Sequence, residues 1–347
     1  MEPPLRPPLE LMDDAVAEIL LRIPPDDSAH LFRSAAVCRP WRRILSDGAF
    51  RRRYRVLHRS PFLLGFLQNL CDDGSIPRFV FAAAAPRLPI PALRCRHGWA
   101  LLRSLGPEGL IVWDPISGGH KEVAVPEYPY HWCNATVFCA ATDGCNHRDC
   151  CGGPFTVVFV GTDNEQDVTW ACTYLSETDA WSAPTILTEG SGCILEQRPS
   201  LLTADAIYFI LDYSKRILQY DMTGQLTLSV IYAPDFYQRP EGIAIAADDG
   251  GLGFAGVKDG ILSLWCWYAG PDSIAGWVQR SIQSFAEGTD TTVMSTNVGV
   301  FAIKLKSGHV RKLGVTGSYY SIVPYVSFCI PVIQVKLVAL RNTDVSG

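Results

Sequence analysis

Cysteines and a histidine in one short run are the residues of this sequence best suited to chemistry. Residues 139–151 read CAATDGCNHRDCC, and Cys145, His147, Cys150 and Cys151 within this run are residue types that ligate zinc. Their spacing is not that of a zinc finger, and adjacent cysteines rarely ligate one ion well. We therefore expect a loop with free thiols at this place and no bound metal.

Motifs that would indicate catalysis are missing from the rest of the sequence. No Gly-rich loop is followed by Lys-Ser or Lys-Thr, so there is no phosphate-binding loop, and no G-x-S-x-G run occurs. The neighbouring carboxylates of Asp248 and Asp249 precede two glycines, as ordinary turn residues do. We expect a non-catalytic protein without a cofactor.

The composition is that of a globular chain of mild net acidity. The 347 residues carry a net charge of −5, which gives no reason to expect nucleic acid as a partner. No apolar run reaches the ~18–20 residues of a membrane span, so we expect no membrane association. Without an apolar secretion signal, the 12 Cys are expected to be free thiols in the cytoplasm and/or the nucleus.

The first sixty residues differ from the rest of the chain in charge and in pattern. They hold 11 Arg, no Lys and 8 acidic residues, whereas the remainder is acidic. Apolar residues recur at helical spacing between Asp13 and Ile23, and Pro24 stops that helix. A second helix and a short third one follow, and Phe50 begins one or two further turns. Three short helices cannot bury this apolar stripe alone, so either the downstream domain or another chain is expected to cover it.

Two runs of residues at fixed spacing carry a resemblance to a known family. The first is Leu11, Asp13, Asp14, Val16, Glu18, Ile19, Leu20, Arg22, Ile23 and Pro24, and the second is Leu31, Val37, Cys38, Arg39, Trp41, Arg42, Ile44, Leu45, Ser46, Asp47 and Phe50. In number and spacing these residues resemble the F-box. The sequence departs from the F-box pattern at Met12, Ala15, Pro40 and Gly48, and the first three of these raise the question of weaker docking than the family norm.

The resemblance implies binding to the Skp-type adaptor of an SCF ubiquitin ligase and, through it, to a cullin. The residues that it assigns to adaptor binding are Leu11, Met12, Val16, Ile19, Leu20, Ile23, Pro24, Leu31, Val37, Cys38, Trp41, Ile44 and Phe50. An amphipathic helix pair with exposed apolar anchors suits a hydrophobic groove on such a partner. Trp41 fits equally well as an anchor and as the core tryptophan of the helices. The Arg-rich run 51–55 is interpreted as the solvated face of a helix.

The remainder of the sequence repeats a theme of apolar strand, polar turn and second strand. Five such units are residues 109–126, 168–184, 217–234, 262–282 and 300–313. Each has a further strand candidate before it, and four strands per ~40–50 residues are typical of a β-propeller. A sixth unit would combine residues 62–84 with 321–340 and so join the two ends of the array. The alternative is a β-sandwich or two packed sheets.

We therefore expect an α+β multidomain chain. A disordered segment spans residues 1–9, a three-helix F-box domain residues 10–57, and an all-β, degenerate propeller of about six blades residues 58–347. The run with Trp113, Asp114, Pro115, Ser117 and Gly118 is similar to the region downstream of the F-box in large plant F-box families, which implies a plant-type F-box protein.

The function that this resemblance implies is substrate recognition for an SCF-type ubiquitin ligase, with an unknown target protein bound by the β domain. The alternative is a propeller-scaffold ligand sensor or a lectin-like binding protein, and an enzyme is less favoured. Aromatic residues on the loops of the β domain are candidates for the recognition surface, namely Tyr128, Tyr130, Trp132, Phe236, Tyr237, Tyr319 and Tyr320.

Overall fold

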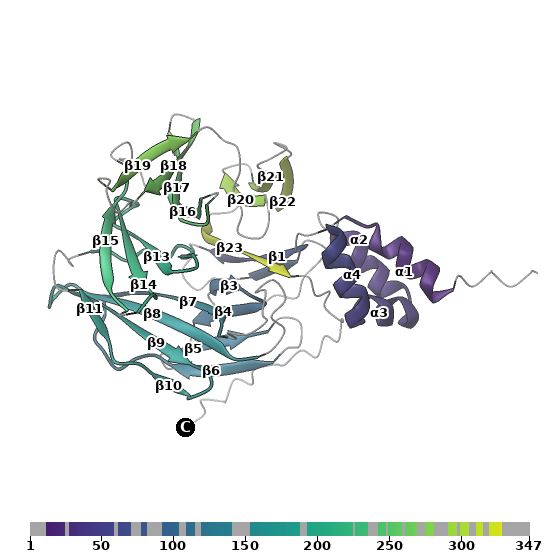
Figure 1. The fold of residues 1–347 in the computed structure, drawn as a ribbon, viewed down its shortest axis with the longest axis horizontal. Coiled ribbons are helices and arrows are strands. Elements are labelled where there is room, and N and C mark those ends of the chain that lie inside the picture. Colours follow the sequence, from purple (N-terminus) through teal and green to yellow (C-terminus); the bar gives the residue numbers. More distant parts are fainter. Residues whose placement is uncertain are drawn as a thin grey trace, which may run out of the picture.

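The structure, a computed structural model, describes eighteen stretches of the chain. They are residues 12–24, 28–58, 62–70, 78–81, 92–103, 109–114, 119–140, 153–187, 193–224, 226–234, 242–247, 249–258, 261–268, 275–280, 291–296, 299–304, 310–314 and 319–327. The segment 1–9, predicted to be disordered, lies outside these residues. Figure 1 shows the helices beside a large array of strands. We call residues 13–58 the helical module and strands β1–β23 the β domain.

The helical module contains α1 (Asp13–Leu21), α2 (Ser28–Val37), α3 (Arg39–Ser46) and α4 (Gly48–His58). The sequence predicted three helices followed by one or two further turns. In the structure these turns form a full helix, α4. Asp13 and Asp14 lie in the first turn of α1, where negative charge favours a helix N-terminus. Pro40 lies in the first turn of α3, the place in a helix where proline is tolerated.

The described strands form six antiparallel sheets, each built mainly from strands that are consecutive in the chain. With the strands of each sheet given in spatial order, the first sheet is β2 (Arg78–Phe81), β1 (Phe62–Leu70) and β23 (Tyr319–Ser327), and the second is β3 (Ala92–Arg96), β4 (Trp99–Arg103), β5 (Gly109–Trp113) and β6 (His120–Ala124). The third sheet is β10 (Ala180–Trp181), β9 (Val168–Leu175), β8 (Phe155–Asp163) and β7 (Trp132–Cys139), with β11 (Thr185–Leu187) also paired to β9, and the fourth is β12 (Leu201–Leu202), β13 (Ala206–Leu211), β14 (Arg216–Asp221) and β15 (Leu228–Tyr232). The fifth sheet is β16 (Ile243–Ala246), β17 (Leu252–Lys258), β18 (Ile261–Tyr268) and β19 (Gly276–Arg280), and the sixth is β20 (Thr291–Thr296), β21 (Gly299–Lys304) and β22 (Val310–Gly314).

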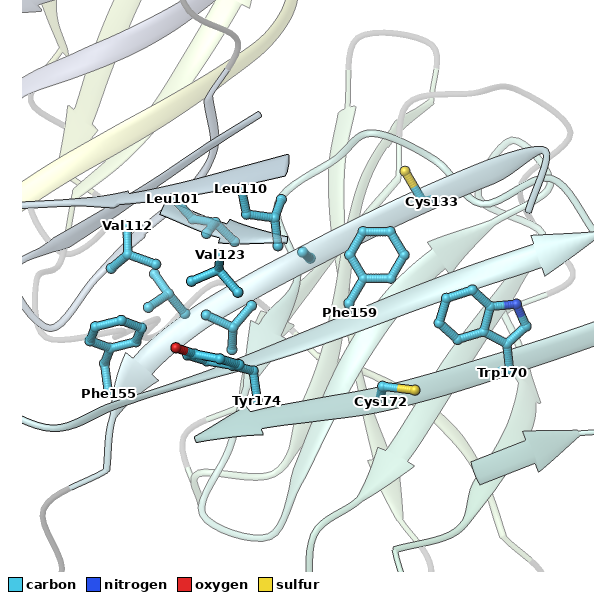
Figure 2. Close-up of a cluster of buried hydrophobic side chains, with 13 residues drawn as sticks. Leu101, Leu110, Val112, Val123, Cys133, Phe155, Phe159, Trp170, Cys172 and Tyr174 are labelled. Carbon is cyan, nitrogen blue, oxygen red and sulfur yellow. The ribbon is translucent and has the colours of Figure 1, made fainter. Parts of the chain in front are cut away.

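Neighbouring sheets pack face to face along the chain. One buried cluster joins β4–β6 to β7–β9, a second joins β8 and β9 to β13 and β14, and a third joins β13 and β14 to β17 and β18. Figure 2 shows the first cluster, in which Leu110 and Val123 from one sheet lie near Phe159 and Tyr174 from the next. The sheets are arranged around a common centre (Figure 1), so the β domain is β-propeller-like.

The two ends of the strand array meet in one sheet. β23 pairs with β1 over most of its length, from Phe62 with Ser327 to Leu70 with Tyr319. β23 also lies beside β3 and β20, which are edge strands of the two adjacent sheets. The predicted closure of the array by its first and last segments is therefore confirmed. The five predicted strand–turn–strand units are also confirmed, since each corresponds to one antiparallel pair, such as β14 with β15.

Candidate functional site

The end of α1 is held by side chains from α4. The Tyr54 hydroxyl donates a hydrogen bond to the Ile23 carbonyl, and His58 Nε2 lies 2.7 Å from the Leu21 carbonyl oxygen. These carbonyls lie at the C-terminal end of a helix, where no intrahelical donor remains for them. The Arg53 guanidinium adds an ion pair with Glu18 on α1. α4 therefore fixes the segment that carries Ile19 and Ile23.

The start of α4 depends on Asp47. Its Oδ2 accepts hydrogen bonds from the backbone N–H of Ala49 at 2.9 Å and of Phe50 at 3.1 Å. A side-chain oxygen in this position satisfies donors that have no partner within the helix. The matched Asp47 thus has a local structural role, because it allows α4 to begin directly after α3.

Four of the residues predicted to bind the adaptor are buried inside the helical module. They are Val16, Leu20, Leu31 and Phe50. Together with Tyr54 they belong to one apolar cluster. In this structure they shape the module from within and present no surface to a second protein.

The remaining predicted residues reach the surface in whole or in part. Met12, Ile19 and Val37 are 75%, 49% and 63% exposed, and Pro24 is also exposed. Four residues are half-buried, namely Ile23, Cys38, Trp41 and Ile44. Trp41 packs against the buried cluster, as expected of a core tryptophan, and part of its surface stays accessible. Leu11 lies outside the described residues.

Two further apolar side chains of α4 are exposed and were not among the predicted site residues. Val56 is 78% exposed and Leu57 is 59% exposed, near the C-terminal end of the helix. The sequence signal for them was present, since both follow the Arg-rich run on a predicted helical turn. That run lies on α4, where Arg52 and Arg53 are exposed as the solvated-face interpretation expected, whereas Arg51 and Arg55 are half-buried and Tyr54 is buried.

Part of the apolar stripe of the helices is covered by the β domain. Cys95, Ala100 and Leu102 of β3 and β4 belong to the same buried cluster as the helical core. Figure 1 shows the helices outside the array of sheets, next to β1. The β domain therefore covers one side of the helical module, whereas Ile19 and Val37 of the helical module remain exposed.

The aromatic residues proposed as a recognition surface of the β domain lie in different places. Tyr128 and Tyr130 precede β7, but Trp132 begins β7 and is not a loop residue, because its backbone pairs with Thr162 of β8. Tyr319 and Tyr320 were likewise expected on a loop and instead lie in β23, within the closing sheet. Phe236 and Tyr237 lie outside the described residues.

A partly buried polar network joins β7 to the segments before β12 and before β16 and to the turn between β13 and β14. The Arg198 guanidinium Nε lies 2.7 Å from Glu196 Oε2, and the Ser214 N–H donates to Glu196 Oε1 at 2.6 Å. The Asn134 side-chain amide donates to the carbonyls of both Glu196 and Arg198, and Arg198 Nη1 donates to the Gly242 carbonyl at 3.0 Å. Burial raises the pKa of the Glu196 carboxyl, and Arg198 opposes part of this rise. The network fixes the backbone between neighbouring sheets.

Among the described cysteines, Cys38, Cys172 and Cys193 are free thiols. Cys133 and Cys139 lie on β7, and burial raises the pKa of the Cys172 thiol on β9 to about 11. Among the described residues no group of three or more His, Cys, Asp or Glu side chains is arranged to hold a metal ion. Cys145, His147, Cys150 and Cys151 lie outside these residues. None of the described helices is long and apolar enough to cross a membrane.

Comparisons with known proteins give likenesses in structure only. No protein-family model matches the chain, and no curated protein matches it. A protein from Lactobacillus plantarum is 11% identical with a TM-score of 0.36, over 74% of this chain and 97% of that one. A protein of unknown function from Bacteroides thetaiotaomicron is 13% identical with a TM-score of 0.37, over 69% and 66% of the two chains. The WD40 domain of SCAP from fission yeast is 12% identical with a TM-score of 0.32, over 66% and 56%.

Proposed function

We propose that this chain is a substrate-recognition subunit of an SCF-type ubiquitin ligase. The helical module is an F-box that binds a Skp-type adaptor, which links it to a cullin, and the propeller-like β domain binds a target protein. The chain itself catalyses nothing in this role. It raises the effective concentration of the target at an enzyme that is bound elsewhere in the assembly.

The observation that carries the proposal is the exposure of apolar residues among those assigned to adaptor binding. Met12, Ile19 and Val37 are large apolar side chains in solvent on or next to α1 and α2. Their burial against a partner would contribute about 1.5–3 kcal/mol for each side chain that is fully covered. An exposed helical surface with such anchors fits a hydrophobic groove on another protein.

The proposal is tested by co-purification of the full-length chain with a purified Skp-type adaptor. Ile19→Asp introduces a charge on the exposed face of α1 and is expected to weaken adaptor binding by at least about tenfold. Val37→Asp is expected to act in the same direction from the end of α2. Ile186→Asp, at a side chain that is 55% exposed on β11, is the matched control and should leave binding unchanged.

These variants separate a docking role from a structural one. Since Ile19 and Val37 are exposed, both variants should retain the unfolding temperature of the unmodified chain. Adaptor binding that persists in both variants, or no binding by the unmodified chain, would contradict the proposal.

A further inference from the structure

Two segments at one end of the sheet that contains β7 lie against each other. They are residues 127–132, which lead into β7, and residues 163–167, which connect β8 to β9. The His131 N–H donates to the Thr162 carbonyl at 2.8 Å, and the Trp170 indole N–H donates to the Pro129 carbonyl at 2.9 Å. We call the exposed side chains of these two segments the acidic aromatic patch.

The aromatic side chains of the patch rest on buried rings. Tyr128 is 43% exposed, and its ring centroid lies 5.4 Å from that of Trp170. Tyr130 contacts Phe159 edge-on at 5.4 Å, and the Phe159 and Trp170 rings are stacked. Trp132 is 41% exposed although its backbone is fixed in β7. Rings held in this way lose little conformational entropy when a partner covers them.

The charges of the patch are all acidic. Glu127, Glu165 and Asp167 are exposed, and the two segments contain neither Lys nor Arg. His131 is placed between carboxylates, with Nδ1 at 3.2 Å from Asp163 Oδ1 and Nε2 at 3.8 Å from Glu165 Oε1. Complementary charge favours a cationic partner and disfavours an acidic peptide or a nucleic acid. Exposed tyrosine and tryptophan faces also attract Arg and Lys side chains.

We propose that the acidic aromatic patch binds a protein segment that carries arginine or lysine. In a substrate-recognition subunit this segment would belong to the target, and in that respect the inference rests on the proposed function. The patch would then determine the class of target, namely proteins with an accessible basic stretch, while the helical module binds the adaptor.

The test is selection of a random-peptide display library on the immobilised full-length chain, followed by equilibrium binding of the enriched peptides by fluorescence anisotropy. We expect the enriched peptides to be rich in Arg and Lys. Trp132→Ala should weaken their binding by about tenfold. Glu165→Gln combined with Asp167→Asn should weaken it by about three- to tenfold at low salt and by less at high salt.

Matched controls place the effect on the patch. Tyr232→Ala removes an aromatic residue that is 71% exposed on β15, and Glu177→Gln removes an exposed carboxylate from the turn after β9. Both should leave peptide affinity unchanged. Circular dichroism of each variant shows whether the fold is retained, and the double charge variant replaces exposed side chains only, so it tests the inference even if Trp132→Ala unfolds.

Three results would contradict the inference. They are failure to enrich any peptide, enrichment of acidic or apolar peptides, and unchanged binding of the peptides to the patch variants. Displacement of the peptides by methylguanidine at concentrations near their own affinity would identify a small-cation site instead. Adaptor binding is measured on the same proteins, so that a failure of the proposed function and a failure of the patch inference are distinguished. The Ile19→Asp variant should still bind the peptides, and the patch variants should still bind the adaptor.

Discussion

The helical module and the β domain differ in how their apolar residues pack and in how far two ion pairs, one in each region, are exposed. The helical module leaves large apolar side chains in solvent, such as Ile19 and Val37, and its ion pair between Glu18 and Arg53 is exposed. The β domain packs apolar residues between successive sheets, and its pair of Glu196 and Arg198 is partly buried. The exposed apolar residues of the helical module follow one helical pattern, and such a surface suits one kind of partner. In the β domain the sheets form the scaffold, and recognition is left to the segments at the ends of the strands.

The largest expected effect concerns chain closure, which only the β domain has. A chain that ends at residue 318 lacks β23, so β1 loses its antiparallel partner and β3 loses its neighbour at the centre. We expect this chain to lose cooperative unfolding, as measured by near-ultraviolet circular dichroism during heating. A chain that begins at residue 59 retains the closure and should still unfold cooperatively. Cooperative unfolding of the first chain would show that the ring does not depend on its closing strand.

A second pair of substitutions compares packing in the two regions. A Cβ at Gly161 in β8 would lie 2.5 Å from the Trp170 ring, so Gly161→Ala is expected to cost about 1–3 kcal/mol of unfolding free energy. A Cβ at Gly48 in α4 would approach Arg52 Nη1 to 3.5 Å, an ordinary contact. Gly48→Ala should therefore be neutral or stabilise by up to about 1 kcal/mol, since alanine favours a helix. Urea denaturation measures both, and equal effects would contradict the packing difference.

A third comparison concerns the two ion pairs. Glu196→Ala removes the partly buried acceptor of the Arg198 Nε–H and of the Ser214 N–H, so we expect a loss of about 1–3 kcal/mol. Glu18→Ala removes an exposed pair and should cost less than about 1 kcal/mol. Chemical denaturation at neutral pH measures the difference, and a larger cost for Glu18→Ala would contradict the expected difference between the partly buried and the exposed pair.

The Glu196 carboxyl also predicts a pH dependence. Burial raises its pKa in the folded chain, so folded molecules bind more protons than unfolded ones in the window above the ordinary pKa of glutamate. Its contribution to stability is therefore greatest below the unfolded pKa and falls as the pH rises through the folded pKa. Glu196→Gln should flatten this part of the curve of unfolding free energy against pH. An unchanged curve would show that another group is responsible.

The repeated hairpins of the β domain were predictable from sequence, and the innermost strand β7 was not. The pair of β14 and β15 follows apolar alternation around a polar turn, which a sequence displays directly. β7 contains Asn134 and Thr136, polar residues that are buried, and the Asn134 amide donates to the backbone carbonyls of Glu196 and Arg198 in the segment before β12. The burial of these polar residues depends on partners far away in the sequence, and such burial leaves no local pattern. The sequence therefore did not indicate strand β7, and its first residue, Trp132, was expected on a loop.

The candidate site shows the same limit. The spacing of the F-box-like residues placed apolar side chains on short helices, but it did not separate Val16, which is buried, from Ile19, which is exposed. That separation depends on how α4 packs, through the bonds of Tyr54 and His58 to the end of α1. These contacts join residues more than thirty positions apart, and helical periodicity contains no information about them.

The central claim is that the two regions bind different partners independently. Its most direct test is titration calorimetry of the purified Skp-type adaptor into the full-length chain and into the Ile19→Asp and Trp132→Ala variants. We expect one-to-one binding that Ile19→Asp weakens by at least about tenfold and Trp132→Ala leaves unchanged. Absence of binding to the unmodified chain, or equal affinity of the unmodified chain and Ile19→Asp, would contradict it.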